Sequence, residues 1–222
     1  MKLSIIIPIL NEAVELPDLL DHLLPWTRQG VEIVLVDGGS RDCSATLALT
    51  TGFRVLDSAP GRALQMNVGA QAASGDVLLF LHADTRLPEG GMQAIEGALS
   101  RHDWGRFDVR IVGKPLALRL VAALMNGRSR ITGIATGDQA LFMSRRAFEA
   151  VGGFPDLPLM EDIAICQALK RLSWPACLHL RVATSGRRWE TRGVWRTIAL
   201  MWWLRWRYWL GTSADEIARA YR

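Results

Sequence analysis

The sequence predicts an α/β fold in which a mostly parallel sheet is covered by helices on both faces. Short apolar runs alternate with amphipathic segments through the first half of the chain. Half of the 222 residues are hydrophobic and 22% are charged, which is the composition of a globular protein. Alternation of strand and helix patterns is typical of a parallel sheet with helices on both faces.

Four apolar runs in the first half predict the strands of this sheet, at residues 3–9, 31–36, 53–56 and 77–81. Helical spacing or composition between these runs predicts three helices, at residues 16–24, 43–50 and 63–73. Ligands bind beyond the carboxyl ends of the strands in such sheets. Polar segments follow three of the runs, at 11–12, 37–42 and 82–85, and we expect them to share one rim.

The second half has a less regular pattern. We predict strands at 107–112, 139–144 and 177–182, a helix at 116–125 and another that begins near Leu159. From Gly193 onward the chain is predicted to be helical, with a break at Gly211 and a final helix that opens at Ser213 or Asp215.

Charge and cysteine content narrow the function classes. The net charge of +4 comes almost wholly from arginine, whose planar fork suits phosphate, and it indicates an anionic ligand or surface. The three cysteines are widely spaced and form no C-x-x-C pair, so we expect neither disulfides nor a zinc site, and a cytoplasmic location. The first apolar run breaks at Asn11-Glu12 without a cleavage site, so we expect a buried strand and no signal peptide. No nucleic-acid partner is expected.

The segment Asp37-Gly38-Gly39-Ser40 stands where a strand ends and a helix begins. Its glycines let a backbone approach a ligand, and a helix amino terminus favours negative charge. The chain has neither G-x-G-x-x-G nor G-K-[ST], so a Rossmann dinucleotide site and a P-loop are disfavoured. Asp37 can instead accept a hydrogen bond from a pyrimidine imide or a ribose hydroxyl. Arg62, at the start of the third helix, can pair with a diphosphate; the alternative is a solvated arginine.

Asp84 follows the apolar run 77–81 at a strand tip. A divalent cation that holds a nucleotide diphosphate takes one or two carboxylates and completes its octahedron with phosphate oxygens and water. Asp84 is therefore a candidate ligand for Mg²⁺ or Mn²⁺, and a solvated loop residue is the alternative. His82 is a weaker candidate ligand, or a polar residue that points into the cleft.

Seven segments occur in the order found in family 2 glycosyltransferases of the GT-A fold: SIIIPILNEA, VDGGSRD, GRALQMNVGA, FLHADT, GDQALFM, GGFPDLPLMED and SGRRW. The set most resembles the small bacterial branch labelled radical-SAM/selenodomain-associated or arsenosugar-biosynthesis glycosyltransferase. The resemblance implies a Rossmann-like nucleotide-diphospho-sugar transferase fold in one GT-A domain, residues 1–222. Within it we expect a nucleotide-binding half (1–100), an acceptor and catalytic half (101–192) and C-terminal helices (193–222).

The resemblance also implies roles for individual residues. Asp37 falls on the aspartate that reads the base, and the other expected nucleotide-binding residues are Pro8, Asn11, Glu12, Gly39, Ser40, Arg62 and Asn67. Asp84 falls on the last carboxylate of D-x-D, whose first aspartate is replaced by His82. Glu161-Asp162 fall on the E-D pair, whose aspartate is the catalytic base. Arg188-Trp189 fall on the end of Q-x-x-R-W, where Ser185 replaces the glutamine.

The chemistry of transfer agrees with these assignments. Inversion needs a base that takes the proton of the acceptor hydroxyl, and a carboxylate at a helix start can do this. We assign Asp162 to this role, with a helix cap as the alternative. Departure of the diphosphate needs positive charge, which the metal, Arg62, Arg187 or Arg188 supply.

The segment GVWRTIALMWWLRWRYWLG, residues 193–211, holds five tryptophans and three arginines. Tryptophan and arginine together are typical of a membrane interface, so we expect contact with the inner membrane surface. Arg192, Arg196 and Arg207 share a helical face, whereas Arg205 lies nearly opposite. The alternatives are a helix packed on the domain and a homodimer contact.

These observations predict a metal-dependent, inverting glycosyltransferase of hexosyltransferase type. Its donor is a nucleotide-diphosphate sugar, with a UDP-sugar favoured, and its acceptor is unidentified. A sugar-phosphate nucleotidyltransferase is the first alternative, although PILNEA lacks the glycine-rich basic loop that such enzymes have after the first strand. A catalytically silent, membrane-associated nucleotide-binding module is the second.

Overall fold

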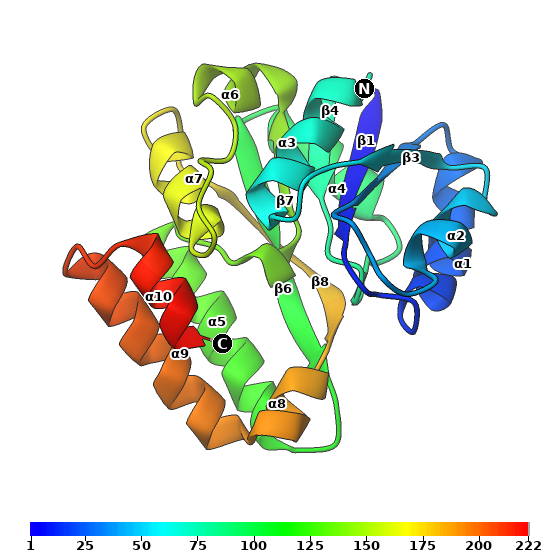
Figure 1. The fold of residues 1–222 in the computed structure, drawn as a ribbon. Coiled ribbons are helices and arrows are strands. Elements are labelled where there is room, and N and C mark those ends of the chain that lie inside the picture. The colour runs from blue at the N-terminus through cyan, green and yellow to red at the C-terminus, as the bar shows by residue number, and fades with distance from the viewer. Residues whose placement is uncertain (222) are drawn as a thin grey trace.

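The computed structural model describes residues 1–221, so Arg222, the last residue of the expected C-terminal segment, lies outside the described residues. Its centre is an eight-stranded sheet in the order β3-β2-β1-β4-β7-β6-β8-β5 (Figure 1). The strands are β1 (Leu3–Ile9), β2 (Glu32–Asp37), β3 (Arg54–Asp57), β4 (Val77–Phe80), β5 (Thr85–Arg86), β6 (Trp104–Val112), β7 (Leu141–Ser144) and β8 (Ala176–Ser185). The helices are α1 (Leu16–Thr27), α2 (Ser44–Leu49), α3 (Arg62–Ala72), α4 (Gly91–Leu99), α5 (Ala117–Thr132), α6 (Arg145–Ala150), α7 (Glu161–Leu169), α8 (Arg187–Arg192), α9 (Val194–Trp209) and α10 (Ala214–Tyr221), with a 3₁₀ turn η1 (Gly137–Gln139).

The first four strands are parallel and confirm the predicted pattern of the first half. β1 pairs with β2 and β4, and β2 pairs with β3, all in parallel register. β7 then runs antiparallel to both β4 and β6, whereas β6 and β8 are parallel. The carboxyl ends of β1, β2 and β4 therefore meet at one edge of the sheet, where the three polar segments follow them.

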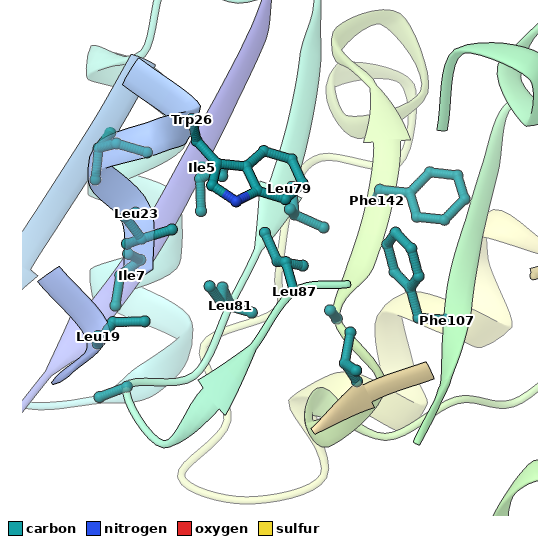
Figure 2. Close-up of a cluster of buried hydrophobic side chains, with 14 of the residues drawn as sticks. Ile5, Ile7, Leu19, Leu23, Trp26, Leu79, Leu81, Leu87, Phe107 and Phe142 are labelled. Carbon is teal, nitrogen blue, oxygen red and sulfur yellow. The ribbon is translucent and has the colours of Figure 1, made fainter. Parts of the chain in front are cut away.

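Helices cover both faces of the sheet, as the sequence predicts. On one face, α1, α2, α4 and α5 contribute to one core that includes Ile5 and Ile7 of β1. Figure 2 shows Leu23 and Trp26 of α1 pointing toward this strand. On the other face, α3, α6 and α7 pack on Ile6 and its neighbours. Because β-strand side chains alternate between faces, one continuous apolar run supplies both cores.

A third, smaller core joins the C-terminal helices to α7. Ile163 of α7, Leu204 of α9 and Ile217 of α10 are buried against one another. In Figure 1, α9 and α10 (orange and red) lie beside α5 and α7. No helix within residues 1–221 is both long enough and apolar enough to cross a membrane.

Several elements differ from the predicted pattern. β5, α4, α6 and α8 have no predicted counterpart, and β6 begins at Trp104, three residues earlier than expected. The predicted strand at 139–144 begins only at Leu141, because Gln139 closes η1. The helix predicted at 116–125 continues to Thr132, because the amide of Asn126 is satisfied by the backbone of Val109 on β6. A polar residue inside a helix looks like a helix end until its partner on another element is known.

Candidate functional site

The rim is organised by Asp37 at the end of β2. Its carboxylate accepts hydrogen bonds from the backbone N–H groups of Gly39 and Ser40, both at 3.0 Å, and from Ser40 Oγ at 2.5 Å. Gly39 has φ 86°, a left-handed conformation that suits glycine. Asp37 is almost fully buried, and these three donors leave part of its acceptor capacity unused.

The loop after β1 is tied to the same turn. Asn11 has φ 55°, its N–H donates to Ser40 Oγ at 2.9 Å, and its Oδ1 accepts from Arg41 N at 2.8 Å. The N–H of Glu12 donates to Ser44 Oγ at 2.7 Å. Pro8 precedes this loop within β1, opposite Val36. The structure thus brings the predicted residues of the β1 and β2 ends into one continuous loop surface.

α3 is fastened to both strand ends by Gln65. Its amide Nε2 donates to the carbonyls of Ile9 and Val36, each at 2.8 Å. A Cβ on Gly38 would lie 2.9 Å from this amide, so the glycine permits the close approach. The first residue of α3, Arg62, is held beside the rim by this packing. Asn67, one turn later, exchanges two hydrogen bonds with the backbone of Phe154, which commits its side chain to the loop before α7.

Two carboxylates converge where β1 and β4 end. The pKa of Glu12 is raised, first by burial and then by the negative charge of Asp84, whereas Arg187 lowers it. Arg187 lies 3.3 Å from Glu15 and 3.9 Å from Glu12. Asp84 Oδ1 accepts from the hydroxyls of Thr85 at 3.2 Å and Thr184 at 3.4 Å. The repulsion that raises the pKa of Glu12 is what a bound cation relieves.

These residues fit a divalent cation of the hard, oxygen-binding type. Two carboxylates and the oxygens of a diphosphate match the ligand preference of Mg²⁺ and Mn²⁺. Within residues 1–221, no group of three or more His, Cys, Asp or Glu side chains could hold a metal without such additional ligands. The donor set therefore suits an ion that arrives with a phosphate-bearing ligand.

His82 is engaged by the turn η1. Its Nδ1 lies 3.2 Å from Oδ1 of Asp138, and its ring fills the space that a Cβ on Gly137 would need, with Nε2 only 2.4 Å from that position. Burial raises the pKa of Asp138, but the hydrogen bond and charge of His82, with Arg62 and Arg188, lower it overall. The histidine at the first D-x-D position thus shapes the loop that carries Gly137 and Asp138.

α7 begins at the pair Glu161-Asp162. Met160 directly before it has φ 70°, an uncommon conformation for a residue with a side chain. Asp162 Oδ2 accepts from the N–H of Gly137 at 3.1 Å and Oδ1 from the N–H of Ile163 at 2.8 Å. Glu161 is buried, with Oε1 3.3 Å from Arg62 Nε. Its pKa is raised, because burial and the charge of Asp162 outweigh the opposing charge of Arg62.

The small hollow between these elements has a volume of about 10 Å³, enough for about one water molecule. Its lining joins α3, the loop after β4, η1 and α7 through Arg62, His82, Gly137, Glu161 and Asp162. Predicted residues from three separate segments therefore meet at one point. Arg62 and His82 come from the first half of the chain, and Glu161 and Asp162 face them from the second half.

The remaining predicted residues occupy the start of α8. Arg188 lies over the ring of Tyr221 with 5.0 Å between Cζ and the ring centroid, and its charge reaches Asp138. Trp189 is half-buried against the core of the first sheet face. Arg187 is the arginine of this group that faces the carboxylates of the rim.

Sequence reasoning missed three residues of this site. Glu15 pairs with Arg187, and Gly137 and Asp138 hold Asp162 and His82. The segment GDQALFM contains Gly137 and Asp138, and this glycine followed by aspartate was the available signal. Glu15 carries no such signal, because its partner lies 172 positions away.

Residues 4–133 match the family model described as Glycosyl transferase family 2. A PGL/p-HBAD biosynthesis glycosyltransferase of Mycobacterium bovis (strain BCG / Pasteur 1173P2) is 43% identical over 93 residues, which cover 39% of this chain and 36% of that protein. The chain thus spans about a third of the length of curated relatives that it matches.

Two solved structures resemble the fold over most of this chain. TarS 1-349 of S. aureus in complex with UDP-GlcNAc has a TM-score of 0.66 at 19% identity, covering 83% of this chain and 58% of that one. Glucosyl-3-phosphoglycerate synthase from Mycobacterium tuberculosis, in complex with Mg²⁺ and UDP, has a TM-score of 0.62 at 21% identity, covering 82% and 70%. These matches confirm the predicted GT-A fold.

Proposed function

Because the chain belongs to glycosyl transferase family 2 and is a glycosyltransferase of the GT-A fold, we propose that it transfers a sugar from a UDP-sugar to an acceptor hydroxyl with inversion and with help from a divalent cation. One observation carries the proposal: Glu12 and Asp84 converge beside Arg187 on one side of the rim, and Asp162 stands on the other at the start of α7. The nucleotide-binding half is then residues 1–100, and the acceptor and catalytic half is 101–192.

The base of the donor is held at the loop surface around Asp37. The carboxylate retains acceptor capacity after its three internal hydrogen bonds, and a pyrimidine imide N–H can use it. Pro8, Asn11, Gly39 and Ser40 form the surrounding surface. Two of the similar solved structures contain UDP or UDP-GlcNAc, which supports uracil as the base.

Asp84 is the proposed protein ligand of Mg²⁺ or Mn²⁺, with Glu12 near enough to share the charge of the ion. A bound cation supplies positive charge to the diphosphate as it departs. Arg62 and Arg187 add positive charge from the two sides of the same rim, and Arg188 adds more from the start of α8. His82 holds η1 through Asp138 and is available to the ion only at the expense of that contact.

Asp162 is the proposed general base. Its carboxylate is oriented by the N–H groups of Gly137 and Ile163, so it keeps one position beside the hollow that the residue lines. Glu161 is buried, and its carboxylate forms an ion pair with Arg62. Of the two adjacent carboxylates, Asp162 is therefore the better placed to accept the proton of an acceptor hydroxyl.

We also propose that the protein acts in the cytoplasm against the inner membrane surface, as a member of the radical-SAM/selenodomain-associated or arsenosugar-biosynthesis branch. Four tryptophans of α9, Trp195, Trp202, Trp206 and Trp209, recur at intervals of seven, four and three residues and are exposed. This spacing places them on one helical stripe. Arg207, stacked 5.0 Å from the Trp203 ring, borders the stripe and suits anionic lipid. A homodimer contact through the same stripe is the alternative.

A calorimetric comparison of nucleotides tests the proposed function. UDP is expected to bind more tightly than ADP, because a site built to pair with an imide rejects a base that cannot make the bond, and Mg²⁺ is expected to strengthen UDP binding. Equal affinity for UDP and ADP, or an affinity indifferent to Mg²⁺ and Mn²⁺, contradicts the proposal. Hydrolysis of UDP-sugars without an added acceptor then identifies the donor.

A further inference from the structure

A second and larger cavity, of about 610 Å³, adjoins α7, the helix that also lines the small hollow. This cavity is open to solvent and is lined by α5, α7, α9 and the loop before α10, and its volume is in the range of small-molecule sites. Its lining includes two arginines and several hydroxyl groups, together with apolar side chains: Arg128, Thr132, Ile163, Arg205, Tyr208 and Ser213. None of the lining residues is acidic.

Arg128 and Arg205 lack the partners that half-buried arginines usually have. Nη2 of Arg128 is shielded from solvent and has no hydrogen-bond partner within residues 1–221. Neither the Arg128 nor the Arg205 guanidinium forms an ion pair with any other residue that the structure describes. Buried charges are normally paired or hydrogen-bonded, so two unpaired arginines at one cavity point to a missing anion.

The surroundings of the two arginines disfavour their charged forms. Burial lowers the pKa of Arg128 to about 10, and the positive charge of Arg205 adds to the effect. Burial likewise lowers the pKa of Arg205. An anion between two guanidinium groups removes this repulsion and can accept bidentate hydrogen bonds from both, for which phosphate has the right geometry.

The cavity is coupled to the proposed general base. α7 contributes Asp162 to the small hollow and Ile163 to the larger cavity. The charge of Asp162 raises the pKa of Tyr208, after the larger effect of burial, and it opposes the lowering at Arg128 and Arg205. A molecule anchored at the arginines therefore lies within electrostatic reach of the carboxylate that takes the proton.

We propose that this cavity is the acceptor subsite and that Arg128 and Arg205 bind a phosphate group carried by the acceptor. The inference rests on the proposed function, because it places the acceptor relative to Asp162, and it adds the chemical class of the acceptor. Trp209 lines the cavity and also belongs to the exposed stripe of α9. A prenyl phosphate from the membrane and a soluble sugar phosphate carry the same anchoring group.

The first experiment measures binding of inorganic phosphate by calorimetry with UDP and Mg²⁺ at saturation, so that the nucleotide site is already filled. The variants are Arg128→Gln and Arg205→Gln, and Arg119→Gln, an exposed arginine on α5, is the matched control. Arg128→Gln and Arg205→Gln are each expected to weaken phosphate binding about tenfold or more, because hydrogen bonds to charged groups are among the strongest. The control is expected to match the wild type.

Two outcomes overturn the proposal: wild-type protein that does not bind phosphate, or variants that bind it as tightly as wild type. Thermal unfolding of Arg128→Gln and Arg205→Gln shows whether these variants are folded. Arg128→Lys, which keeps the charge, is expected to retain part of the affinity for phosphate. UDP binding is measured on the same samples. Loss of phosphate binding with intact UDP binding supports the subsite, whereas absence of UDP binding in the wild type refutes the proposed function instead.

The second experiment compares farnesyl phosphate with ribose 5-phosphate under the same conditions. Tighter binding of farnesyl phosphate than of inorganic phosphate identifies a lipid acceptor, and tighter binding of ribose 5-phosphate identifies a soluble one. Either result supports the subsite if Arg205→Gln abolishes the gain in affinity over inorganic phosphate. If neither compound exceeds inorganic phosphate, the cavity is not an acceptor subsite.

Discussion

The carboxylate of Asp162 accepts a 3.1 Å hydrogen bond from the backbone N–H of Gly137, a residue 25 positions earlier in the chain. The ring of His82 stands against the same glycine and contacts Asp138 next to it. The candidate base and the histidine of the D-x-D position are thus connected through one short turn. A change in this turn should therefore alter the positions of both Asp162 and His82.

Gly137→Ala tests this connection. The new Cβ would lie 2.4 Å from Nε2 and 2.6 Å from Cε1 of His82, so either the ring or η1 must move. We expect a loss of stability of about 1–3 kcal/mol, as for other overpacked sites, together with a fall in kcat. Urea unfolding and initial rates of sugar transfer measure the two effects.

Gly97→Ala is the control for this variant. Gly97 lies inside α4 with open space around its Cβ position, so alanine there is expected to stabilise the protein by roughly 0.5–1 kcal/mol. In the double variant Gly137→Ala with His82→Ala, part of the stability that Gly137→Ala loses should be regained. Equal losses with and without the His82 ring would show that the two residues are not coupled.

Asp162→Asn is expected to lower the rate of sugar transfer by roughly 10²–10⁴-fold and to leave UDP binding nearly unchanged. The amide keeps the size and one hydrogen-bond acceptor of the side chain but cannot take a proton. Glu161→Gln is the matched variant and should cost less. An inactive Glu161→Gln beside an active Asp162→Asn would move the role of base to Glu161, and activity in both would place the base elsewhere.

The pH dependence of stability reports on Glu161. Its pKa is higher in the folded protein than the ordinary value of 4.5, so ionised Glu161 destabilises the fold above the folded pKa and has no such effect below 4.5. Glu161→Gln should therefore gain stability relative to wild type as the pH rises from 4 to 8. Urea unfolding of the variant and the wild type at pH 4 and at pH 8 measures the gap between their free energies of unfolding. Glu149→Gln, at an exposed position of α6, is the control; a Glu161→Gln gap that shrinks with rising pH contradicts the argument.

Replacement of Asp84 by alanine is expected to remove the metal-dependent part of UDP affinity while the fold remains intact. The carboxylate is the proposed ligand, and its two hydroxyl partners, Thr85 and Thr184, can still hydrogen-bond to each other when it is lost. Calorimetry with and without Mg²⁺ measures the difference. Asp21→Ala, at an exposed position of α1, is the control, and a metal dependence that survives in Asp84→Ala argues for different ligands.

The tryptophan stripe predicts binding to anionic vesicles. Trp202 and Trp206 are 67% and 57% exposed, and each buried aromatic side chain contributes roughly 1.5–3 kcal/mol. Trp202→Ser with Trp206→Ser should weaken binding to phosphatidylglycerol vesicles by at least tenfold in a co-sedimentation assay. Trp174→Ser removes an exposed tryptophan that lies outside α9, and this variant should bind the vesicles as the wild type does. Analytical ultracentrifugation of the same variants tests the dimer alternative: a dimer that dissociates on loss of the stripe assigns it to self-association.

The sequence predicted the first half of the fold well because its pattern is local. Apolar runs such as 3–9 and 77–81 are buried on both faces, and their polar successors meet at the rim. β5 could not be predicted in the same way, because Thr85 and Arg86 are ordered by pairing with Thr184 and Ala183 of β8. The candidate site follows the same division. Glu12 and Asp84 follow strands and were found, whereas Glu15 and Asp138 acquire their roles only through distant partners.

The ties between Asp84 and β8 have a consequence for the protein during its synthesis. Thr184 donates to the Asp84 carboxylate, and the N–H of Ser185 donates to its backbone carbonyl. A ribosome that has made the first hundred residues has produced the polar residues that follow β1, β2 and β4, but not the strand that holds Asp84 in place. A nascent chain therefore fixes the position of Asp84, the proposed metal ligand, only after β8 has emerged. Translational pausing before that strand should leave an intermediate with an ordered Asp37 turn and a mobile Asp84.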